Sequence, residues 1–71
     1  MTKKEILKQI GNARYKTRLA MYRGDSKKAA MYDDETEKLI EKAKKLKIEL
    51  EEIGTALLDA DEVAEMVHEE A

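Results

Sequence analysis

Residue types that could take part in catalysis are scarce in this chain. His68 is the only histidine, cysteine is absent, and Ser26 stands where a helix cap is expected. A nucleophile, a base and an orienting group therefore cannot be assembled at a useful spacing. We predict a protein that is not an enzyme, with no catalytic residue and no cofactor.

Glu65 and His68 match the Glu-x-x-His element that carboxylate-bridged dimetal bundles use. Such sites also need glutamates that project inward from other helices of the bundle. The positions that we expect to face the core of this protein are apolar. We therefore predict no metal site.

Basic and aromatic residues near the start of the chain are better candidates for binding. Residues 1–28 carry nine lysines and arginines against two acids, whereas residues 49–71 carry nine acids and neither lysine nor arginine. Basic side chains can contact phosphates, and tyrosine rings can stack on bases. The candidate nucleic-acid contacts are Lys8, Arg14, Tyr15, Arg18 and Tyr22. The acidic C-terminal segment is an alternative partner for the same basic residues, and the sequence leaves this choice open.

A helix over residues 3–22 must position these side chains. Thr2 and Glu5 fit a capping box at its start. Two stripes follow, and they predict that this helix packs against two neighbouring helices. The first stripe is Ile6, Ile10, Ala13, Thr17 and Ala20, and the second is Tyr15, Leu19 and Tyr22. Gly24 and Asp25 then predict a turn over residues 23–26, because glycine suits the end of a helix and aspartate the start of the next.

A heptad seam at alternating steps of four and three organises the middle of the chain. Its members are Tyr32, Thr36, Leu39, Ala43, Leu46, Leu50, Ile53 and Leu57. The seam predicts one helix over residues 27–54, and a partner must cover its apolar side. The 3–22 helix is too short to cover all of it. We therefore expect a protein interface formed by Leu39, Leu46, Leu50, Ile53 and Leu57.

The C-terminal part of the chain allows two architectures. Weak helix formers at Gly54 and Thr55 and acids at Asp59 and Asp61 favour a break, followed by a short helix over residues 60–70. That short helix would fold back and bring its acids to the basic first helix. In the alternative architecture, the heptad phase continues without a slip and one long helix reaches the C terminus.

Four short fragments of the chain show a resemblance to a known family: Met1-Thr2-Lys3, Glu5, Ala13-Arg14-Tyr15 and Leu58-Asp59-Ala60-Asp61-Glu62. Together they cover under a quarter of the sequence, and they resemble parts of the plasmid repressor-of-primer family. Members of that family are dimeric helical hairpins that bind RNA. By analogy, the resemblance implies a dimeric helical bundle for this chain.

Length and composition are typical of one small helical domain, 1–71. The 71 residues include no cysteine and no proline, and 42% of them are charged. A core of this size supplies little stability alone, so association is expected to add to it. We predict an all-α fold, in which an antiparallel helical hairpin with a short third helix forms a coiled-coil-like bundle as a homodimer.

The predicted function is that of a small non-enzymatic regulatory, adaptor or inhibitor protein. It would act through helix-helix contacts with a protein partner and with itself. A nucleic-acid-binding protein that uses the basic N-terminal helix is the first alternative, and a purely structural oligomer is the second. No apolar run is long enough to span a bilayer and no signal peptide begins the chain, so we expect a cytoplasmic protein with no membrane partner.

Overall fold

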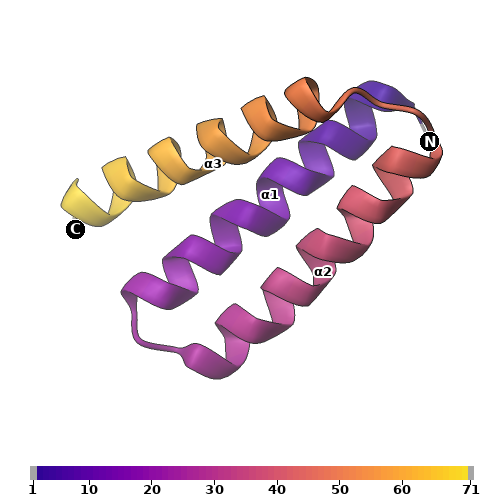
Figure 1. Ribbon diagram of the computed structural model, residues 1–71. Coiled ribbons are helices and arrows are strands. Elements are labelled where there is room, and N and C mark those ends of the chain that lie inside the picture. Colours follow the sequence, from indigo (N-terminus) through magenta and orange to yellow (C-terminus); the bar gives the residue numbers. More distant parts are fainter. Residues whose placement is uncertain (1, 71) are drawn as a thin grey trace.

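The first helix of the chain is the middle one in space. The computed structural model describes residues 2–70, in which α1 (Lys3–Tyr22), α2 (Ser26–Lys45) and α3 (Leu50–Glu70) follow one another. α1 lies between the other two helices, with α2 antiparallel and α3 parallel to it (Figure 1). α2 and α3 scarcely contact each other. The prediction of an all-α fold is confirmed for the described residues.

α1 packs on the predicted stripe, and the Thr2 half of the predicted capping box is present at its start. The Thr2 hydroxyl accepts a hydrogen bond from the Glu5 amide at 3.2 Å, which satisfies one of the free donors at the helix start. The buried residues of α1 are the five members of its first stripe, Ile6, Ile10, Ala13, Thr17 and Ala20. Two helices flank α1, so the prediction of two neighbours is confirmed.

The first reversal of the chain is a Schellman motif at Gly24. The Asp25 amide donates to the Ala20 carbonyl at 2.9 Å, and the Gly24 amide donates to the Met21 carbonyl at 3.1 Å. Gly24 has a left-handed backbone (φ 74°), which costs glycine little because it has no Cβ. The Asp25 side chain then caps α2 by accepting from the Lys28 amide at 3.1 Å. The expected turn is therefore present, and Ser26 already belongs to α2.

The predicted helix over residues 27–54 is wrong, because α2 ends at Lys45 in a second Schellman motif. The Ile48 amide donates to the Ala43 carbonyl at 3.1 Å, and the Lys47 amide donates to the Lys44 carbonyl at 3.0 Å. Lys47 adopts the left-handed conformation (φ 61°) without being glycine. Ile48 is buried beside Ala43 in the core, and this burial offsets the backbone cost.

The predicted break near Asp59 and the short helix over residues 60–70 are also wrong. α3 runs without interruption from Leu50 to Glu70. Its buried residues, Ile53, Ala60 and Ala64, share the face that packs on α1. Tertiary packing of this face outweighs the low helix propensity of the residues around it. The idea that a folded-back helix brings acids to α1 is nevertheless confirmed, because Asp61 reaches two arginines there.

The core is concentrated at one end of the molecule, beside the loop that joins α2 to α3. Its buried cluster consists of Ile6, Ile10, Ala43, Ile48 and Ile53, and Leu7, Leu39, Ile40 and Leu57 pack partly buried against it. Toward the other end, the buried positions carry only small side chains: Ala13, Thr17, Ala20, Thr36, Ala60 and Ala64. Packing toward that end therefore buries little apolar side-chain area.

The helices do not resemble membrane spans. Within residues 2–70, none of them combines the length and the apolar character that crossing a lipid bilayer requires.

Candidate protein-interaction surface

The predicted interface residues divide between the core and the surface. Ile53 is buried, and Leu39 and Leu57 pack against the core cluster within the chain. Leu46 and Leu50 remain 51% and 69% exposed. Three of the five residues therefore stabilise the fold itself, and a role for the set in binding another molecule stays a prediction.

A mostly apolar groove runs between α1 and α3. Its floor and walls come from Leu7, Gly11 and Tyr15 on α1 and from Ala56, Ala60 and Val63 on α3. Two adjoining hollows of about 370 and 390 Å³ make up the groove, and they share Leu7, Ala56 and Asp59. Val63 is 49% exposed, so a large apolar side chain faces water at this site. Such a surface can bury an apolar side of another helix.

The edges of the groove carry opposite charges. Lys8 and Asn12 lie on the α1 edge, and three acids lie on the α3 edge, namely Glu51, Glu52 and Asp59. Glu52 forms an ion pair with Lys3 at 2.7 Å through one carboxylate oxygen, whereas its Oε2 has no hydrogen-bond partner among the described residues. The α1 edge is therefore basic and the α3 edge acidic, and the Oε2 atom of Glu52 is buried within the chain.

The register of α1 against α3 is fixed along their whole length. Lys3 meets Glu52 near one end, and Tyr22 stacks on His68 near the other, with ring centroids 4.2 Å apart. Between them, a Cβ added to Gly11 would lie 3.8 Å from the Ala56 carbonyl oxygen. Residue numbers rise together on both helices, as expected for parallel neighbours.

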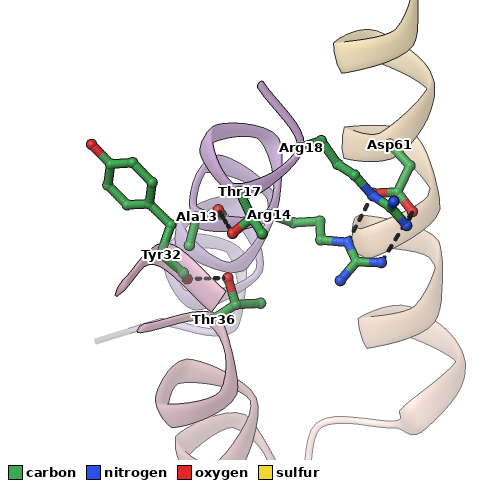
Figure 2. A network of polar contacts seen from close by, with 7 residues as sticks. All are labelled: Ala13, Arg14, Thr17, Arg18, Tyr32, Thr36 and Asp61. Atoms are coloured by element: carbon green, nitrogen blue, oxygen red, sulfur yellow. Dashed lines mark hydrogen bonds and ion pairs between the residues drawn. The ribbon is translucent and has the colours of Figure 1, made fainter. Parts of the chain in front are cut away.

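Asp61 on α3 binds two arginines of α1 (Figure 2). Its Oδ1 accepts from Arg14 Nε at 2.8 Å and from Arg18 Nε at 3.0 Å, and its Oδ2 lies 3.4 Å from an Nη2 atom of each. Partial burial of Asp61 would raise its pKa, but the hydrogen bonds from the two guanidinium groups outweigh it and hold the pKa below its ordinary value. The hydrogen bond to Asp61 is also the main cause that raises the pKa of Arg14. The carboxylate is therefore charged at neutral pH and anchors α3 to α1.

This network changes the set of candidate nucleic-acid contacts. Arg14 and Arg18 both form ion pairs with Asp61 of the same chain. Tyr15 lies half-buried in the groove, and Tyr22 stacks on His68 at an interplanar angle of 11°. Lys8 is exposed and forms no ion pair within residues 2–70. The structure does not bring the five predicted residues together in one site.

A second basic site lies on the other side of α1, against the start of α2. A hollow of about 300 Å³ there is lined by three basic residues, one acid and one aromatic ring: Lys16, Arg23, Lys28, Asp25 and Tyr32. The Lys16 ammonium lies 5.8 Å from the centre of the Tyr32 ring, within reach of a cation–π contact. None of the three basic residues forms an ion pair with the described part of the chain.

Metal ligands do not converge in the structure. Among residues 2–70, no group of three or more histidine, aspartate or glutamate side chains could hold a metal ion. Glu65 and His68 both lie on the exposed C-terminal part of α3.

The two faces that form the groove also have periodic patterns in the sequence, separate from the heptad seam. Leu7, Gly11 and Tyr15 recur at steps of four, and Ala56, Ala60 and Val63 recur at steps of four and three. Each set therefore shares one face of a helix. Gly11 and Ala56 carry little apolar side-chain area, so the sequence pattern of each face is only weakly apolar and does not by itself indicate a binding surface.

Comparison of the sequence with protein-family models, with curated proteins and with solved structures finds no match.

Proposed function

We propose that this protein is a small non-enzymatic regulatory, adaptor or inhibitor protein that acts through helix-helix contacts at the groove between α1 and α3. One observation carries the proposal: the groove is lined mainly by apolar side chains, and Val63 at its edge is half exposed. Apolar side chains that line a hollow are left in water unless another molecule covers them.

The shape and composition of the groove suit a helix as the bound element. Both walls are helical, and small residues at Gly11, Ala56 and Ala60 let another helix approach closely. An amphipathic helix docks by laying apolar residues at spacings of three and four into such a groove. Polar residues along both edges then meet the polar sides of the bound helix, as at the rim of an ordinary interface.

Site-specific photo-crosslinking in cells tests this proposal. A photoreactive amino acid at position 63 should form adducts with protein, because this position edges the groove. The same amino acid at position 31 is the matched control, since Met31 is 56% exposed on α2 and lies outside the groove. Absence of adducts from position 63, or equal adducts from both positions, would contradict a helix-binding role for the groove.

Nucleic-acid binding is a second candidate function, favoured by the basic hollow around Lys16, Arg23 and Lys28. These residues carry positive charge that no carboxylate within residues 2–70 neutralises through an ion pair, and Tyr32 supplies an aromatic ring beside them. Basic side chains next to an aromatic ring are the elements that hold single strands.

Titration with a fluorescent single-stranded oligonucleotide tests this second function. Affinity should fall steeply with salt, and the double substitution Lys16→Ala with Lys28→Ala should weaken binding about tenfold or more, because phosphate contacts are lost. Lys42→Ala, on the exposed far end of α2, is the control and should bind as the wild type does. No binding at low salt would exclude the function.

A further inference from the structure

We infer that the molecule bound in the α1–α3 groove is a second copy of this chain, in a dimer whose two-fold axis runs parallel to the helices. In this arrangement α1 of each copy lies against α3 of the other copy. The inference rests on the proposed function, since it names the partner for the same groove. It is carried by the charges along the groove, by their positions along the helices and by the exposed area.

The charges decide which way two grooves can face each other. A two-fold axis parallel to the helices places the α1 edge, with Lys8, opposite the acidic α3 edge of the second copy. A two-fold axis across the helices would instead place α1 against α1 and α3 against α3. The lysine edges would then meet each other and the acidic edges would do the same. Opposed like charges disfavour that second arrangement.

Positions along the helices agree with the first arrangement. Rotation about an axis parallel to the helices leaves every residue at its own height, so contacts form between residues at equal heights. Gly11 and Ala56 lie side by side and give a common reference height. At ~1.5 Å per residue, Lys8 lies about 4.5 Å below that height and Glu52 about 6 Å below it. The ammonium of one copy therefore lies at nearly the height of Glu51 and Glu52 on the acidic edge of the other copy.

At the other end of the groove, apolar residues of the two copies lie at similar heights along the helices. Tyr15 lies about 6 Å above the reference height, and Val63 lies about 10.5 Å above it. The exposed side chain of Val63 therefore lies within one helical turn of Tyr15 of the second copy. Apolar contacts at this end and ion pairs at the other fix both the position and the direction of the partner.

The chain exposes more surface than a compact monomer of its mass, by about the area that one partner buries in an ordinary dimer. A compact monomer of 8.1 kDa is expected to expose about 4,500 Å², whereas this chain exposes 5239 Å². The excess of about 740 Å² is close to the ~800 Å² that each partner buries in a standard interface.

A mixing experiment with charge reversals tests the inference in trans. Lys8→Glu alone sets glutamate against Glu52, and Glu52→Lys alone sets lysine against Lys8, so each variant should dimerise about tenfold or more weakly than the wild type. An equimolar mixture of the two variants pairs opposite charges at both contacts. Its dimerisation should return to within about threefold of the wild type, as measured by sedimentation equilibrium. Contacts within one chain cannot produce this recovery.

Several outcomes would overturn the inference. A wild-type protein that stays monomeric at high concentration would overturn it. Variants that dimerise weakly both alone and in the equimolar mixture would also overturn it. Dimerisation that Lys8→Glu leaves unchanged or strengthens would show that Lys8 does not face the acidic edge of the second copy. Circular dichroism checks the folding of each variant, and Glu52→Gln, which removes only the attraction, replaces Glu52→Lys if helix content falls. Protein adducts from position 63 together with a monomeric pure protein would reject the second copy and leave the proposed function standing.

Discussion

The two reversals of this chain have the same hydrogen bonds and opposite sequence signals. After α1, Gly24 takes the left-handed position, and the two amides that follow the helix cap bond back to Met21 and Ala20. After α2, Lys47 takes the same position with the same bonding pattern. The first reversal therefore relies on the freedom of glycine, whereas the second places a lysine in a conformation that L-residues adopt at a cost.

The residue that follows each left-handed position explains the difference. In the first reversal that residue is Asp25, which is polar and caps α2. In the second it is Ile48, which is buried with Ala43 in the core cluster. Apolar contact across the Schellman motif therefore stabilises the second turn where glycine is missing. A tertiary contact, and not the local backbone preference, ends α2.

Removal of that contact should have the largest effect. Ile48→Ala deletes a buried side chain from the core cluster and is expected to cost about 2–4 kcal/mol of the free energy of unfolding. A core of this size supplies only ~3–5 kcal/mol, so much of the helical signal should be lost. Urea denaturation followed by circular dichroism measures the change. Leu50→Ala, at a 69% exposed position near the same turn, is the control and should cost well under half as much.

Loss of the ion pairs that hold α3 after the second reversal should come next. Every ion pair that joins two helices within residues 2–70 links α1 to α3, and Asp61 takes part in two of them. Asp61→Asn should cost about 1–2 kcal/mol, because charge-assisted hydrogen bonds from two arginines are weakened in a partly buried site. Glu62→Gln, at an exposed position of the same helix outside the groove, is the control and should change the stability little.

The effect of Asp61→Asn should depend on pH in a defined direction. The folded protein holds the pKa of Asp61 below its unfolded value of about 3.9. Its contribution to stability is therefore complete above about pH 5 and is lost as the pH falls through the lower, folded pKa. The difference in free energy of unfolding between wild type and variant should be constant above pH 5 and should close in acid. A difference that grows in acid would contradict the role of the carboxylate.

A smaller loss is expected at the first reversal. Gly24→Ala introduces a Cβ that meets nothing within 4 Å, so the cost is that of the left-handed backbone alone, about 1 kcal/mol. The thermal midpoint and the urea midpoint should both fall. A neutral result would mean that the first turn does not depend on glycine.

The smallest effect should have the opposite sign. Lys47→Gly relieves the left-handed backbone and should stabilise the protein by about 0.5–1 kcal/mol. The gain should be visible as a higher urea midpoint. A loss of stability would show that the lysine side chain contributes contacts beyond those of its backbone.

Local signals in the sequence were enough to predict α1 and the first reversal. Thr2 marks the start of the helix, the stripe from Ile6 to Ala20 marks its buried face, and Gly24 marks its end. The second reversal was missed because the heptad phase continues through it. Ala43 and Ile53 lie on different helices and still face the same helix, α1. A periodic pattern cannot distinguish one long helix from two helices that share a partner.

One residue held a hint of the second reversal. Ile48 does not belong to the seam and would lie on the polar side of a continuous helix, although it is fully apolar. Its burial in the turn explains why it is there. Likewise, the charges of Arg14 and Arg18 were visible in the sequence, but their pairing with Asp61 depends on the parallel approach of α3. The two helix faces that form the groove are visible in the sequence, but their pairing depends on the same parallel approach of α3.

Solution mass, measured by light scattering over a concentration series, tests most directly whether the groove between α1 and α3 binds protein. With increasing concentration, the solution mass of the wild type should rise toward twice the 8.1 kDa of one chain, and the mass of Met31→Glu should rise in the same way. Val63→Glu, which places a charge at the apolar edge of the groove, should stay monomeric with its helix content unchanged. A wild type that is monomeric throughout, or a dimer that Val63→Glu and Met31→Glu weaken equally, would contradict self-association through this groove.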